Sequence, residues 1–174
     1  MTTALVLLAI VVAAIGTAYL VSYNRLVVDR QSVRDSWAVT EAELQRRHDL
    51  VPSLVTSVRG AAAHERELLD DLIRKERAAA DVGPDAAERS DPEQQLAAAA
   101  RAVVALRERY PALNSQQNFL TLQKELALTE DRIGAARRFY NIRVAEFNRR
   151  TEAFPSNIVA RRHGFERAAF FDPD

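Results

Sequence analysis

The side chains best suited to chemistry in this 174-residue chain are its three histidines, because imidazole binds metals and transfers protons near neutral pH. A di-iron centre in a helical bundle needs a glutamate three residues before a histidine on two of the helices. The residues at that position before His48, His64 and His163 are Gln45, Ala61 and Ala160. The sequence therefore contains no di-iron motif.

Other catalytic patterns are missing as well. His64 is followed by Glu65, as in zinc proteases, but Leu68 stands where that motif needs its second histidine. The five glycines are never clustered, so no glycine-rich loop could hold a nucleotide phosphate. No Ser or Cys nucleophile has a local signature beside a histidine, although a pair assembled by the fold would escape this test. We predict no enzymatic activity, no cofactor and no metal site.

A dense group of charges lies at a predicted helix end. Arg46, Arg47 and Asp49, with His48 among them, are our candidate partner-docking residues. Helix capping is the alternative, because basic residues stabilise the end of one helix and an aspartate the start of the next. The sequence alone leaves both interpretations open.

Several polar residues fall on otherwise apolar helical faces. Arg30 and Glu65 are both predicted to point inward, where a charge needs a partner, so they either pair or reach the bundle surface. Tyr140-Asn141 and Phe147-Asn148 each place an amide beside a core aromatic residue. These amides either cap helices and bond between them, or line a binding groove.

An apolar N-terminal segment determines where the part of the chain that carries these residues can lie. The first 24 residues contain no charged side chain, and residues 4–21 form an apolar run of 18 residues. As a helix this run spans about 27 Å, close to the ~30 Å hydrocarbon core of a bilayer. A cleaved signal peptide is the alternative, but Met1-Thr2-Thr3 lacks the basic residue expected there. We predict a retained transmembrane anchor over residues 1–22.

The charges after the anchor predict its orientation. Arg25, Arg30 and Arg34 follow the apolar run and no basic side chain precedes it. The positive-inside rule then predicts a single-pass cell-membrane protein with its body in the cytoplasm. The chain has no cysteine, which excludes a lipid-modified cysteine anchor and disulfide bonds.

The body of the chain is predicted to be all-α. Its net charge is zero with both signs interleaved, so we expect no nucleic-acid partner. Apolar residues recur at helical spacing over residues 23–44, 54–73, 96–110 and 119–147. The clearest stripe repeats every seven residues and consists of Phe119, Leu126, Ile133, Tyr140 and Phe147.

Turn and capping residues separate these stripes. Asp49 with Pro52 marks the predicted first turn, and Gly83-Pro84 opens a loop. Asp91-Pro92-Glu93-Gln94 predicts a capped helix start, and Pro111 a helix stop.

The predicted architecture is an N-terminal transmembrane helix followed by an antiparallel up-down four-helix bundle over residues 23–153. A C-terminal tail follows over residues 154–174, after Phe154-Pro155 ends the fourth helix. If Pro52 only kinks one long helix, the bundle has three members.

Motifs along nearly the whole chain resemble those of the LemA family. They are Tyr23-Asn24-x-Leu26-Val27, Arg46-Arg47-x-Asp49-Leu50-x-Pro52-x-Leu54-Val55, Tyr110-Pro111, Asn118-Phe119-Leu120-x-Leu122-Gln123-x-Glu125-Leu126, Thr129-Glu130-x-Arg132-Ile133, Arg138-x-Tyr140-Asn141, Phe147-Asn148 and Phe154-Pro155-Ser156-Asn157. The resemblance implies a bacterial membrane protein with an N-terminal anchor and an antiparallel four-helix bundle. It implies no settled activity, and the family's associations with magnetosome membranes and membrane proteases point to scaffolding.

The tail combines basic and aromatic residues. An even number of antiparallel helices would return it to the level where the chain leaves the membrane. Ile158, Phe165 and Ala169 would share one helical face, and such a composition suits the lipid interface. The candidate membrane-interfacial residues are Arg161, Arg162, Phe165, Arg167 and Phe170. A frayed tail, or one packed on the bundle, is the alternative.

These features favour a membrane-anchored scaffold or adaptor. It would contact the bilayer through residues 4–21 and dock a membrane-protein partner or a second copy of itself. The alternative is an envelope-facing sensor or ligand-binding module, with a pocket between helices near the Tyr and Asn residues.

Overall fold

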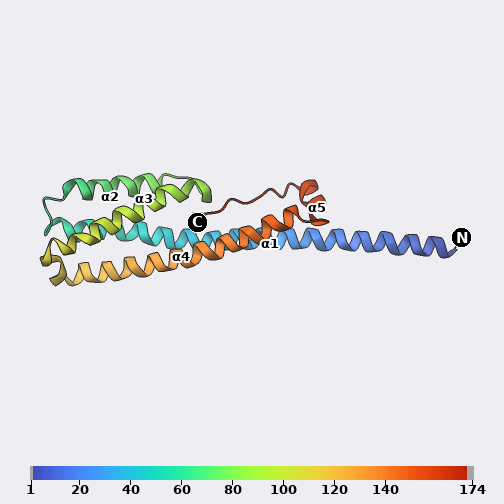
Figure 1. The fold of residues 1–174 in the computed structure, drawn as a ribbon, viewed down its shortest axis with the longest axis horizontal. Helices are drawn as coiled ribbons and strands as arrows, with labels where there is room; N and C mark the ends of the chain where they lie inside the picture. The colour runs from blue at the N-terminus through green and yellow to red at the C-terminus, as the bar shows by residue number, and fades with distance from the viewer. Residues whose placement is uncertain (1, 172–174) are drawn as a thin grey trace. The chain divides into compact units, whose positions relative to one another are not determined.

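A computed structural model describes residues 2–171, and every regular element among them is helical. In chain order these elements are α1 Thr2–Arg59, α2 Arg66–Ala80, α3 Ala86–Val104, η1 Ala105–Glu108, η2 Pro111–Ser115, α4 Gln117–Glu152 and α5 Ser156–His163 (Figure 1). The labels η1 and η2 denote short 3-10 helices. The all-helical prediction is confirmed, and residues 172–174 of the predicted tail lie outside the described residues.

The predicted turn at Asp49 and Pro52 is wrong. Helix α1 runs unbroken for 58 residues through Pro52 and ends at Arg59. Proline removes one backbone N–H from a helix and disfavours its interior. Here Val51, Leu54 and Val55 are at most 4% exposed on both sides of Pro52, so tertiary packing outweighs that cost. The sequence-based stripe over residues 54–73 is therefore split between the end of α1 and the start of α2.

The predicted start of the third helix is also wrong. Helix α3 begins at Ala86, where the Asp85 side chain accepts hydrogen bonds from the backbone N–H groups of Ala87 (2.9 Å) and Glu88 (3.2 Å). Two such bonds satisfy donors that a helix start leaves unpaired. Asp91 and Pro92 consequently lie inside α3, and Glu93 is one of its buried residues.

The chain divides into two compact units. Unit 1 comprises residues 1–36 and 141–168, and unit 2 comprises residues 37–140 and 169–174. Helices α1 and α4 contribute residues to both units.

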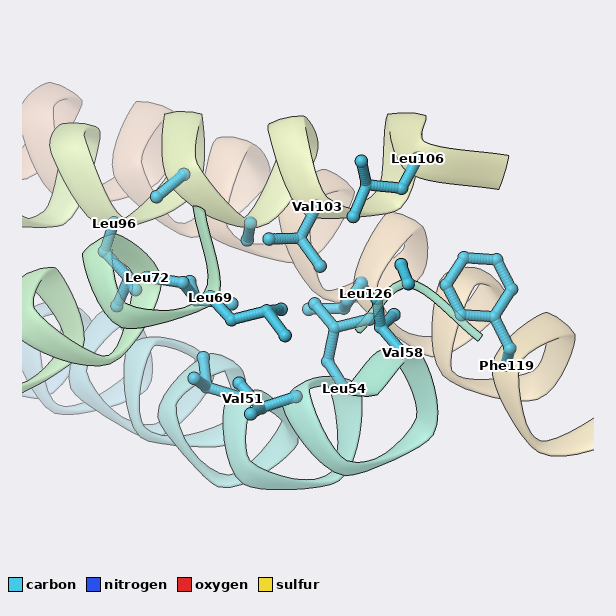
Figure 2. Close-up of a cluster of buried hydrophobic side chains, with 14 of the residues drawn as sticks. Val51, Leu54, Val58, Leu69, Leu72, Leu96, Val103, Leu106, Phe119 and Leu126 are labelled. Atoms are coloured by element: carbon cyan, nitrogen blue, oxygen red, sulfur yellow. The ribbon is translucent and has the colours of Figure 1, made fainter. Parts of the chain in front are cut away.

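Unit 2 contains a continuous apolar core (Figure 2). Helix α1 supplies Val51, Leu54 and Val58, and side chains from α2, α3 and α4 meet them. The members from the other helices that Figure 2 labels are Leu69, Leu72, Leu96, Val103, Leu106, Phe119 and Leu126. Helices α2 and α3 pack side by side in this unit (Figure 1). The seven-residue stripe of α4 is confirmed, because all five of its members are at most 7% exposed.

Unit 1 has a smaller core. Its most buried apolar side chains come from α1, α4, α5 and the segment after α5, and they are Leu26, Val33, Val144, Phe147, Val159, Ala160 and Phe165. The first part of α1 stands apart from this core. An 18-residue window of α1 near the N-terminus has a mean hydropathy of 2.6 and no buried residue. By length and composition, α1 can therefore cross a membrane.

Candidate functional site

The three candidate docking residues have different environments in unit 2. Arg46 and Asp49 are exposed, whereas Arg47 is 2% exposed. All three lie within α1 rather than at a helix end, so neither a hairpin tip nor a capping role exists there. A docking role remains a prediction for Arg46 and Asp49, and Arg47 is occupied inside the protein.

Arg47 joins three helices through its guanidinium group. Its Nη2 donates to the Glu93 carboxylate of α3 (2.5 Å) and to the Glu93 backbone carbonyl (3.1 Å). Its Nη1 donates to Glu130 of α4 (2.9 Å). Charge-assisted bonds of this kind are about twice as strong as neutral ones and are geometrically specific.

His48 extends this network with two carboxylates. Its Nε2 lies 3.1 Å from Glu93, and its Nδ1 lies 3.2 Å from Glu76 of α2. Ionised carboxylates only accept hydrogen bonds, and a neutral imidazole has a single N–H, so only the protonated ring can satisfy both partners. The hydrogen bond to Glu93 is the main cause that raises the pKa of His48; burial opposes the shift, and Glu76 reinforces it.

Glu93 is the centre of the network. Burial disfavours its charged form, but the hydrogen bonds and charges of His48 and Arg47 outweigh this and lower the pKa of the carboxyl group. Glu93 therefore remains ionised near neutral pH. Because both of its oxygens are occupied by Arg47 and His48, the group holds helices together rather than offering a free acid or base.

A polar cleft of about 470 Å³ opens beside the network in unit 2. The charged residues that line it come from α1, α3 and α4, and Phe171 lines it as well. The lining includes Arg47, Glu93, Arg101, Glu130 and Arg137. No group of three or more His, Cys, Asp and Glu residues within residues 2–171 is arranged to hold a metal ion.

Arg30 and Glu65, which were expected either to pair or to reach the bundle surface, each have contacts within their own unit. In unit 2, Glu65 accepts a hydrogen bond from the Tyr110 hydroxyl (2.8 Å) and pairs with Arg109 (2.9 Å). These contacts, with Tyr110 first, lower the pKa of Glu65, and the same hydrogen bond raises the pKa of Tyr110. In unit 1, the Arg30 guanidinium lies 4.7 Å from the centre of the Phe165 ring.

The polar residues of α4 hold the C-terminal segment. In unit 1, the Asn148 side chain donates to the Ala168 carbonyl (2.9 Å) and accepts from the Ala168 backbone N–H (2.9 Å). In unit 2, the Tyr140 hydroxyl donates to the Ala169 carbonyl (2.8 Å), and burial, aided by the charge of Asp85, raises the pKa of Tyr140 to about 12. The polar groups of Tyr140 and Asn148 are therefore hydrogen-bonded to the backbone of the C-terminal segment. The sequence had left open that they line a ligand-binding groove.

The tail departs from the predicted amphipathic helix. Helix α5 ends at His163 because Gly164 adopts a left-handed conformation (φ 65°), which glycine accommodates without strain. Of the candidate interfacial residues, Arg161, Arg162 and Arg167 are exposed, Phe170 is half-buried and Phe165 is 7% exposed. The helical face expected to contain Phe165 and Ala169 does not form.

Phe165 instead packs inside unit 1. Its ring centroid lies 5.9 Å from that of Tyr23 and 6.5 Å from that of Phe147. In the same unit, His163 lies against the end of the apolar run of α1. Its Nε2 is 2.7 Å from the Tyr19 hydroxyl, and its ring centroid is 4.8 Å from that of Tyr23.

Sequence reasoning missed the roles of Glu93 and His163. Glu93 has a detectable signal, because it precedes Leu96 and Ala100 at the three- and seven-residue spacings of an inward helical face. Arg47 likewise falls between Leu44 and Val51 on the stripe of α1. His163 has no such signal, because its contacts depend on Tyr19, 144 positions earlier in the chain.

An all-helical chain with a long apolar N-terminal helix defines a broad class of proteins. Comparison with known families identifies a family within this class, because the model of the LemA family matches residues 36–174. The chain therefore belongs to the LemA family. It is also similar to Protein LemA of Metamycoplasma hominis, with 24% identity over 148 residues that cover 85% of this chain and 68% of the relative.

Proposed function

We propose that this LemA family member is a membrane-anchored helical scaffold that docks a membrane-protein partner and catalyses no reaction. The observation that carries the proposal is the composition of α1. Its N-terminal stretch is apolar and contains no buried residue, and the same helix later supplies Leu44, Leu54 and Val58 to the protein core. One continuous helix thus serves as both anchor and structural element.

The body is proposed to be an antiparallel bundle formed by α2, α3 and the body portions of α1 and α4. The buried network of Arg47, His48 and Glu93 supports this arrangement, because it ties α1 to α3 through groups that are costly to separate. Its function would be rigid presentation of a surface. The flanking arginines after residue 21 favour a cytoplasmic body in a cell membrane, with no nucleic-acid partner.

Site-specific photo-crosslinking in intact membranes tests the docking role. A benzophenone amino acid at Arg46 or Asp49 should give one discrete adduct, whereas the matched exposed position Ala78 on α2 should give none. The adduct should disappear when residues 1–22 are removed, because the partner is expected in the membrane. Identical labelling at all three positions, or labelling that ignores the anchor, would contradict the proposal.

A second candidate function is ligand binding in the cleft of unit 2. Its volume of about 470 Å³ lies within the range of small-molecule sites, and the guanidinium groups of Arg101 and Arg137 suit an anion. Thermal stabilisation of the detergent-solubilised protein by small carboxylates, lost in Arg101→Gln, would favour this function over scaffolding.

A further inference from the structure

The junction between α4 and α5 in unit 1 exposes an unusual combination of side chains. Phe154 is 80% exposed and Ile158 is 57% exposed, although both are large and apolar. Arg161 and Arg162 follow Ile158 by three and four residues within α5 and are exposed as well. At that spacing the three side chains share one helical face.

The opposite face of α5 is fixed to the rest of unit 1. Val159 and Ala160 are at most 2% exposed, and Ser156 is buried with its hydroxyl bonded to the Arg150 carbonyl (2.7 Å). The outward direction of Ile158, Arg161 and Arg162 is therefore set by packing and does not depend on a free tail.

The contacts of His163 place α5 at the end of the membrane-spanning stretch. His163 lies 2.7 Å from the Tyr19 hydroxyl, and the apolar run ends only two residues later, at Val21. Two residues of helix correspond to about 3 Å along the axis. Tyrosine at this position also suits the interface between hydrocarbon and water.

The charged side chains of α5 itself are all basic, and Glu152 and Glu166 lie beside Arg161 in a neighbouring hollow. Arg161 and Arg162 are exposed, whereas Arg167 pairs with Glu152 at 2.8 Å and contributes less. Arg25, one turn beyond the apolar run, is also exposed. Arginine binds phosphate oxygens through a planar fork of donors.

We propose that α5 and Phe154 form a second membrane contact, which lies on the bilayer surface beside the anchor. Phe154 and Ile158 insert below the headgroups, while Arg161 and Arg162 bind the phosphates of anionic phospholipids. This site differs from the sequence-based one, because Phe165 is buried and takes no part. The proposal rests on the proposed membrane anchoring and adds lipid-headgroup recognition to it.

Spin labels on the full-length chain test the contact. The chain has no cysteine, so Ile158→Cys provides a single attachment site, and Ala145→Cys labels an exposed position of α4 in the same unit as control. The labelled protein is reconstituted into vesicles of phosphatidylcholine, with or without phosphatidylglycerol. Collision of the label with oxygen, which enters lipid, is compared with collision with a water-soluble nickel complex.

In anionic vesicles we expect the label at residue 158 to collide more often with oxygen than with the nickel complex. The label at residue 145 should collide more often with the nickel complex. Arg161→Gln with Arg162→Gln should lower the ratio of inserted to free α5 about 25-fold, at about 1 kcal/mol for each arginine. Arg34→Gln with Arg149→Gln removes the same charge from exposed positions elsewhere in unit 1 and should leave the ratio unchanged.

Each other outcome overturns the proposal in a distinct way. Nickel access at residue 158 equal to that at residue 145 shows that α5 does not touch lipid. Insertion that is equal with and without phosphatidylglycerol would show that anionic headgroups are not recognised. A low collision rate with both oxygen and the nickel complex would show that the label contacts protein instead of lipid. Co-flotation of the chain with vesicles separately reports the anchor: a chain that does not float contradicts anchoring itself.

Discussion

At the scale of single residues, Glu93 links α3 to α1. Its carboxylate receives Arg47 on one oxygen and His48 on the other, and all three side chains are at most 7% exposed. A buried ion pair adds little stability compared with apolar packing, but removal of one partner leaves an uncompensated charge. We therefore expect the network to restrict the register of the two helices, since an altered alignment would bury unpaired charges.

The raised pKa of His48 predicts a pH-dependent stability. A group whose pKa is higher in the folded state stabilises that state fully below its unfolded pKa, and the contribution is lost as pH rises through the folded pKa. The pKa of His48 in the unfolded chain is taken as the ordinary histidine value of 6.5. The detergent-solubilised chain should therefore unfold at lower temperature as the pH rises above 6.5.

Substitution isolates this effect. His48→Gln should flatten the pH profile of the unfolding temperature, whereas His64→Gln, at an exposed position, should leave it unchanged. Because the pKa of Glu93 is lowered in the folded state, its ionised carboxylate stabilises the fold at neutral pH, and this stabilisation is lost only in acid. A profile that stays the same in His48→Gln would show that another group titrates.

At the scale of elements, α4 shows how a regular apolar repeat defines a helix and its inner face. Five aromatic or aliphatic side chains recur every seven residues, and all of them are buried. Helix α1 is the contrasting case, since a proline lies in its interior and apolar packing on both sides maintains it.

The register of α4 predicts unequal effects of two nearby substitutions. Leu126 is 5% exposed within the main core of unit 2, and Lys124 is exposed on the same helix. Leu126→Ala should lower the free energy of unfolding by ~2–5 kcal/mol because it removes buried contacts and leaves a cavity. Lys124→Ala should change it by less than about 0.5 kcal/mol. Urea unfolding followed by circular dichroism measures both, and equal losses would mean that the inner face is assigned wrongly.

At the scale of the whole molecule, the apolar stretch of α1 is separable from the buried cores. It contains no buried residue, whereas the core of unit 1 begins at Leu26 and that of unit 2 lies further along the chain. The C-terminal segment is integral, in contrast, because Asn148 and Tyr140 bind its backbone. The N-terminal stretch thus adds no side chain to the buried cores, whereas the C-terminal segment is hydrogen-bonded to α4.

A chain that begins at Ser22 should consequently be soluble, helical and cooperatively folded. Each buried Leu, Val or Phe that it retains contributes ~1.5–3 kcal/mol relative to exposure, and the deletion removes none of them. Circular dichroism and thermal unfolding measure the outcome. A disordered spectrum would show that the apolar stretch is required for folding.

The amino-acid sequence alone determined the helical class, the long apolar N-terminal stretch and the inner face of α4. Composition and apolar period act locally, and a helix closes its hydrogen bonds within a few residues, so these features need no knowledge of the rest of the fold. The family assignment also followed from the order of motifs along the chain.

Only the tertiary structure decided the continuity of α1 through Pro52, the burial of Arg47 and the course of the tail. The continuity of α1 depends on core packing around Pro52. The burial of Arg47 and the course of the tail depend on partners far away in sequence, Glu93 for Arg47 and Tyr19 for His163. A local pattern predicts a turn at Pro52 and a surface charge at Arg47, because isolated proline breaks a helix and isolated arginine prefers water. Packing and charge pairing reverse both preferences, and neither can be evaluated until the partners are in place.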